Sequence, residues 1–232
     1  MNLILNIETS GNICSVSLSD NEHVLVVKEN SDKNSHSSQL AVLVNELFAT
    51  SGFSIQQLSA VAISKGPGSY TGLRISTSFA KGLCYSLSIP LIAIDTLKIL
   101  AKQFILHHPI PIHSFICAMI DARRMEAYNA LFTSQLEYVT ETQPVVLTPD
   151  SFSEYQNKAI YFIGNGVTKW KQLVTGKWQP SYFIENCYPS SEAMAYLSAL
   201  AFHDKQFENL AYFEPSYLKE FIAGTSQKNK LI

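Results

Sequence analysis

The sequence predicts an α/β protein that is built from two similar halves. Short apolar runs separated by turn residues predict an antiparallel meander of strands near the N-terminus, at residues 3–7, 13–18 and 23–27. Further apolar runs then alternate with helical patterns, which is typical of an α/β sheet. The order of strand, acid-led turn and strand returns at an offset of 113 residues, so that Ile7-Glu8 falls on Ile120-Asp121. Two such halves create a cleft between them.

The remaining elements follow from periodicity, caps and breakers. In the first half we expect helices at 36–50, 72–86 and 97–106 and strands at 60–64 and 91–94. In the second half we expect strands at 115–120, 125–132, 145–147 and 159–163, helices at 149–156 and 190–202, a short helix after 164–166, and a frayed tail at 224–232. Pro109 and Pro111 break the pattern between the halves. The predicted domains are therefore 1–106 and 107–232, and the last helical segment is a candidate to return to the first domain.

Composition indicates an ordinary globular protein. The 232 residues are 47% apolar, and the formal charge of −2 gives no overall electrostatic footprint for nucleic acid. The four cysteines are widely spaced without a CxxC pair, so we expect reduced core thiols. The N-terminus has no signal-peptide pattern, and no run approaches the ~20 apolar residues of a membrane span. We therefore expect a cytoplasmic location.

A glycine-rich run, GPGSYTGLR at residues 66–74, links a strand to a helix. Glycines permit positive φ or close approach of another group, and a helix N-terminus favours negative charge. The run therefore predicts either an anion cradle, with Gly68 and Ser69 in it, or a tight strand-to-helix turn. It is neither a Walker loop nor GxGxxG.

Glu8 and Asp121 are the carboxylates that the repeat places symmetrically at the expected cleft. Paired acids there, with Ser10 beside the first, could hold a metal–nucleotide complex or transfer a proton, or each acid could cap its own turn. The six histidines show no HxxxH or HExxH spacing, so no metal site is expected. No distinctive nucleophile motif is present either.

Basic and aromatic residues alternate in one stretch of the second half. They could contact RNA by stacking and phosphate binding, or they could belong to a half-buried surface helix; the residues are Lys169, Trp170, Lys171 and Trp178.

The first two helices carry a candidate partner interface. Gly72, Ser76 and Ala80 form a stripe of small residues that would let another helix approach closely, and Ile75 and Phe79 form the adjacent row. Either row could instead pack on the sheet of this chain. The proposed contact set comprises His36, Leu40, Leu43, Leu47, Tyr70, Leu73, Ser76, Phe79, Ala80 and Leu83.

Seven stretches of the sequence together resemble one family. The specific block is GPGSYTGLR (66–74), followed by AKGL (80–83) and IP (89–90); IETS (7–10), HS (36–37), DARRMEAY (121–128) and PSYL (215–218) support it. Taken in their order along the chain, these stretches resemble the TsaB family, formerly YeaZ, of bacterial tRNA threonylcarbamoyladenosine (t6A) biosynthesis.

The resemblance implies an actin-like ATPase (ASKHA, ribonuclease H-like) fold and a non-catalytic scaffold role. It implies a TsaD-like paralogue as the transferase partner, with a TsaE-like ATPase joining them and tRNA bound only through the complex. It implies no cofactor for the chain alone, with ATP or ADP bound only in the complex. Alone, the chain could form a homodimer. The competing hypothesis is a small-molecule kinase of the same superfamily that uses Glu8 and Asp121.

Overall fold

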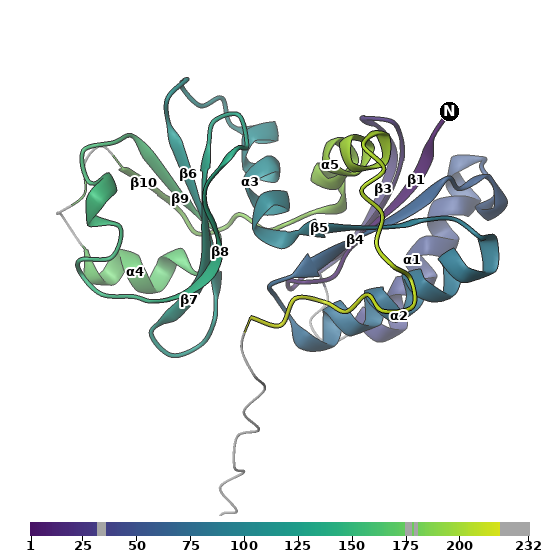
Figure 1. Ribbon diagram of the computed structural model, residues 1–232, viewed down its shortest axis with the longest axis horizontal. Helices are drawn as coiled ribbons and strands as arrows, with labels where there is room; N and C mark the ends of the chain where they lie inside the picture. The colour runs from purple at the N-terminus through teal and green to yellow at the C-terminus, as the bar shows by residue number, and fades with distance from the viewer. Residues whose placement is uncertain (32–35, 175–177, 179–180, 219–232) are drawn as a thin grey trace, which may run out of the picture.

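The computed structural model describes residues 1–31, 36–174, 178 and 181–218, and it contains two five-stranded mixed sheets (Figure 1). The first sheet has the order β3-β2-β1-β4-β5, with strands Leu3–Glu8 (β1), Cys14–Asp20 (β2), His23–Asn30 (β3), Ala60–Gly66 (β4) and Leu91–Asp95 (β5). The second has the order β10-β9-β6-β7-β8, with strands Phe115–Asp121 (β6), Glu126–Thr133 (β7), Tyr138–Val146 (β8), Ile160–Ile163 (β9) and Ser181–Ile184 (β10).

The two sheets repeat one topology. In each sheet, the first three strands pair antiparallel to one another. The fourth strand pairs parallel to the first, and the fifth pairs parallel to the fourth. Glu8 ends β1 and Asp121 ends β6, so the repeat read from the sequence is present in three dimensions. This duplication confirms the predicted actin-like fold class with two pseudo-equivalent halves.

Within the described residues, five helices cover the sheets: His36–Ser51 (α1), Tyr70–Leu87 (α2), Thr96–His107 (α3), Val167–Leu173 (α4) and Ser191–His203 (α5). Figure 1 shows α1 and α2 on one face of the first sheet, α5 on its other face, α3 between the sheets and α4 on the outer face of the second sheet. Every residue of β1 is buried, because helices cover both faces of the first sheet. The boundary at residue 107 stays a prediction.

The apolar core consists of three clusters that follow these layers. One joins α1 and α2 to the first sheet and includes Leu5, Leu40 and Ala80. The central cluster joins α3 and α5 to both sheets and includes Phe104 and Ile116. The third packs Phe162 and Trp170 on the outer face of the second sheet. The central cluster holds the two halves together and fixes the cleft between them.

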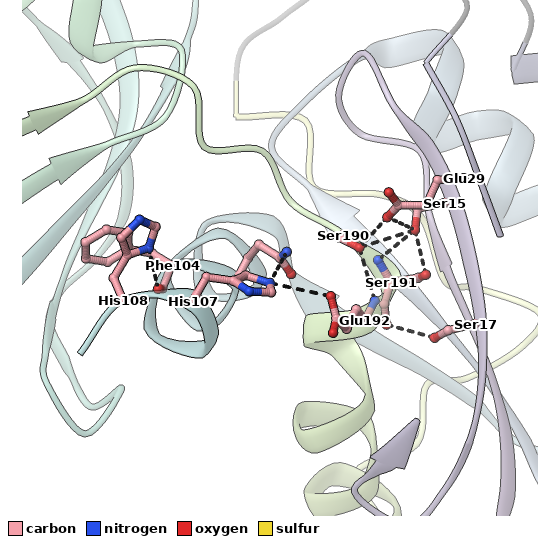
Figure 2. Close-up of polar contacts among 10 residues, drawn as sticks. Ser15, Ser17, Glu29, Phe104, His107, His108, Ser190, Ser191 and Glu192 are labelled. Atoms are coloured by element: carbon pink, nitrogen blue, oxygen red, sulfur yellow. Dashed lines mark hydrogen bonds and ion pairs between the residues drawn. The ribbon is translucent and has the colours of Figure 1, made fainter. Parts of the chain in front are cut away.

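Polar groups fasten α5 to the first sheet after the chain has passed through the second (Figure 2). Ser190 caps α5 and donates to the Glu29 carboxylate at 2.6 Å, and Ser15 donates to the same oxygen at 2.8 Å. Ser17 donates to the carbonyl of Ser191 at 2.9 Å. Because these hydroxyls are satisfied within the protein, their burial fixes α5 in position at little cost.

Two expected elements differ from the structure, and one strand of the structure was not expected. The expected helix at 149–156 is only a 3₁₀ turn at Ser153–Tyr155, because the Ser151 hydroxyl accepts from the Thr148 N–H and Phe152 has a left-handed backbone with φ of 64°, both of which compete with a regular helix. The strand expected at 145–147 runs from Tyr138 to Val146 and forms most of its bonds to β7 before residue 145. The edge strand β10 was not predicted. The expected fraying at 224–232 lies outside the described residues.

The C-terminal part of the described chain returns to the first half, where Figure 1 shows it crossing α2. Glu208 pairs with Leu91 of β5, Phe213 is buried in the α1–α2 cluster, and the Ser216 N–H donates to the Lys65 carbonyl at 2.7 Å.

Across the described ranges, no helix combines the length and apolar character needed to cross a membrane.

Candidate functional site

A cleft of about 1670 Å³ lies between the two halves. The β1–β2 turn and the β4–α2 loop line one side, and the β6–β7 turn lines the other. Four residues of the predicted anion site line it: Ser10, Gly68, Ser69 and Asp121. The fifth, Glu8, is fully buried and is not part of the cleft wall.

The β4–α2 loop packs against its own chain. A Cβ on Gly68 would lie 2.5 Å from the Ser10 carbonyl oxygen, and the Ser69 N–H donates to that oxygen at 2.7 Å. A Cβ on Gly72 would clash with the Thr9 carbonyl oxygen, while the Thr9 hydroxyl donates to the Gly72 carbonyl at 2.8 Å. The glycines therefore allow the β1–β2 turn to pack directly on the β4–α2 loop and the start of α2, which favours the tight-turn interpretation over the anion cradle.

Glu8 is a buried acid rather than an exposed ligand. Its Oε1 accepts a hydrogen bond from the Ser10 N–H at 2.6 Å, and its Oε2 has no hydrogen-bond partner among the described residues. Burial raises the pKa of Glu8 from 4.5 to about 7, and the hydrogen bonds from Ser10 offset this only in part. The side chain therefore carries its full negative charge only above neutral pH.

Asp121, at the equivalent point of the second half, is engaged by its own domain. Its carboxylate forms an ion pair with Lys169 and accepts from the Arg123 N–H at 2.6 Å. These contacts match the turn-capping interpretation of this acid. In the described parts of the chain, no three His, Cys, Asp or Glu side chains gather closely enough to hold a metal ion.

The RNA-stacking interpretation of the two tryptophans is wrong. Trp170 is fully buried and Trp178 is 6% exposed, and both pack around Phe162 in the third core cluster. Neither indole has a face free for a base. Lys169 pairs with Asp121, and Lys171 pairs with Glu185 at 2.8 Å.

The predicted partner interface needs a similar correction. Six of its ten residues are buried in the first half, where they cannot meet a partner: Leu40, Leu43, Leu47, Leu73, Ser76 and Ala80. The small-residue stripe faces the first sheet, because Gly72 at its start approaches the Thr9 backbone. Phe79 and Leu83 are partly exposed and Tyr70 is 41% exposed. The side chain of His36 lies outside the described residues.

A different row of residues forms the outer face of the helix pair. Val42 on α1 and Tyr85 on α2 are 45% and 81% exposed, and Ser78 and Gly82, further along the outer side of α2, are also exposed. A Cβ on Gly82 would meet nothing within 4 Å. We call Val42, Ser78, Gly82 and Tyr85 the outer α1–α2 face. The sequence could have indicated this face, because Ser78, Gly82 and Tyr85 lie on the side of α2 opposite the stripe of small residues.

Comparison with known proteins identifies the family. The model of the family described as "TsaD: tRNA N6-adenosine threonylcarbamoyltransferase" matches residues 25–225. The chain is 28% identical to the Bacillus subtilis tRNA threonylcarbamoyladenosine biosynthesis protein TsaB over 221 residues, which cover 93% of each protein. It is 27% identical to the Escherichia coli protein of the same name, over 95% of this chain and 96% of that one. The chain belongs to this family, in its TsaB (YeaZ) branch.

A solved TsaB-branch structure has the same fold. YeaZ from Pseudomonas aeruginosa superposes with a TM-score of 0.81 at 24% identity, over 94% of this chain and all of that one. The family resemblance inferred from residues 66–74 and the flanking stretches is therefore confirmed. In this TsaB-branch chain the signature block forms the β4–α2 loop and the start of α2, where it closes the first half on itself.

Proposed function

We propose that the chain is a non-catalytic subunit of tRNA threonylcarbamoyladenosine biosynthesis in the cytoplasm, where it supports a TsaD-type transferase. One observation carries the proposal: the groups that would do chemistry in the cleft are used within the chain. The signature loop is packed on Ser10, Glu8 is buried, and Asp121 is paired with Lys169. The full-length relatives named TsaB support the pathway.

The binding surface that we propose is the outer α1–α2 face. It is exposed, it carries the large apolar side chains Val42 and Tyr85, and the small residues Ser78 and Gly82 on α2 leave room for an opposing helix. The partner is the TsaD-type paralogue, with a TsaE-type ATPase as the third component. ATP or ADP would bind only in that assembly, and a homodimer through the same face would form when the paralogue is absent.

The first test measures binding to the TsaD-type paralogue of the same organism by calorimetry. Gly82→Arg and Ser78→Arg place a long charged side chain on the proposed face and are expected to weaken binding at least tenfold, because the opposing helix can no longer approach. Ser153→Arg, on the exposed 3₁₀ turn of the second half, serves as the control and should bind as the wild type does. Unchanged affinity of both face variants would show that the partner binds elsewhere.

The second test separates the scaffold from the kinase alternative. The pure chain is expected to show no ATP turnover above the background of the buffer, while adding it should raise the transferase activity of the paralogue. ATP turnover that Glu8→Gln and Asp121→Asn both abolish would favour the kinase.

A further inference from the structure

An open pocket of about 470 Å³ lies at the opposite end of β6 from the cleft. The start of β6, the end of β7 and the segment before β9 surround it, whereas Asp121 ends β6 at the cleft. Its lining consists of His113, Ser114, Phe115, Thr133, Gln135, Asn157, Lys158 and Ala159. The pocket is separate from both the cleft and the outer α1–α2 face, and the proposed function makes no use of it.

Ser114 supplies a buried hydroxyl that no protein group satisfies. The residue is 2% exposed, and its Oγ has no hydrogen-bond partner in the described part of the chain. Its backbone is nevertheless fixed, because its N–H donates to the Pro111 carbonyl at 3.2 Å. A buried hydroxyl without a hydrogen-bond partner costs free energy, so a ligand that accepts a hydrogen bond from it would offset that cost.

The charges of the lining favour an anion. Lys158 and His113 are the titratable residues in it, and none of the eight residues is acidic. The Lys158 ammonium lies 4.9 Å from the centre of the Phe115 ring and 5.5 Å from that of Tyr155, and it forms no ion pair with a described residue. A cation held over aromatic rings keeps N–H donors available for a further acceptor.

We propose that this pocket binds a small organic anion through its oxyanion head group. Lys158 would supply the charge, the Ser114 hydroxyl and the Asn157 amide would donate hydrogen bonds, and Phe115 and Ala159 would contact the apolar part of the ligand. Phosphate and carboxylate share this chemistry, and their relative affinity identifies the head group.

The test is a titration of ¹⁵N-labelled chain with inorganic phosphate and, separately, with acetate, each compared with sodium chloride at equal ionic strength. Saturable shifts of the Ser114, Phe115 and Ala159 amides are expected with at least one of the two anions. Tighter binding of phosphate assigns a phosphorylated ligand, and tighter binding of acetate assigns a carboxylate. Shifts that fail to saturate, or that sodium chloride reproduces, overturn the proposal.

Two variants with one control test the assigned roles. Lys158→Gln is expected to weaken binding at least tenfold, whereas Lys28→Gln on β3, which removes the same charge elsewhere, should leave it unchanged. Ser114→Ala is expected to weaken binding about threefold to tenfold without lowering the melting temperature, because its hydroxyl has no protein partner to lose. Wild-type affinity in Lys158→Gln, or equal losses in Lys158→Gln and Lys28→Gln, would refute the site.

Discussion

At the level of single residues, the buried carboxyl of Glu8 links stability to pH. Its pKa of about 7 in the folded chain lies above its ordinary value of 4.5, so between these values the folded state holds a proton that the unfolded state releases. Stability is therefore unaffected by this group below about pH 4.5, falls as the pH rises from about 4.5 to about 7, and levels off above that. The full difference corresponds to about 3 kcal/mol.

Glu8→Gln should remove this dependence. Glutamine stays neutral at every pH and its Oε1 can still accept from the Ser10 N–H, so we expect the variant to exceed the wild type by about 1–3 kcal/mol at pH 8.5 and to match it at about pH 4 or below. Urea unfolding at a series of pH values measures this. Glu46→Gln on the exposed side of α1 is the control. Parallel profiles for wild type and Glu8→Gln would show that the acid is already ionised when folded.

At the level of elements, the sequence predicts most strands and helices because their apolar periodicity is strong. The edge strand β10 has only four residues and pairs with β9 alone, so tertiary pairing rather than local pattern defines it. Periodicity also identified the two faces of α2 but not which face packs on the sheet. The Gly72 contact with Thr9 decides that, and it depends on atoms 63 positions apart in the chain. For the same reason a substitution at Ala80 would test the core and not the interface.

Two glycines of α2 should respond to alanine in opposite ways. Gly72→Ala should destabilise the chain by about 1–3 kcal/mol or more, because its Cβ would meet the backbone of Thr9, just after β1. Gly82→Ala should stabilise it by about 0.5–1 kcal/mol, because the site is open and alanine is the better helix former. Thermal or urea unfolding measures both. Equal changes in stability for the two variants would contradict the close packing of Gly72 on Thr9 and the open surroundings of Gly82.

At the level of the whole molecule, the sequence predicted the duplicated fold and the cleft, because a repeated strand, acid-led turn and strand is visible along the chain. The state of the cleft was not predictable. Burial of Glu8 and the ion pair between Asp121 and Lys169 arise from the packing of segments distant in sequence. The cleft that the repeat creates is therefore flanked by two acids that are both occupied by contacts within the chain.

The charge of the whole chain makes a last prediction, about tRNA. The formal charge is −2, Lys169 and Lys171 are paired with acids, and Trp170 and Trp178 are buried, so few groups remain for phosphate contact or stacking in that region. We expect the lone chain to bind tRNA no more tightly than about 10⁻⁶ M at physiological salt, and to lose affinity steeply as salt rises. Filter binding at several salt concentrations measures this, with the complex of the chain and its TsaD-type paralogue as the comparison. The complex should retain tRNA at concentrations where the chain alone does not. Tight retention by the lone chain would mean that it contributes an RNA surface of its own and is more than a protein-binding scaffold.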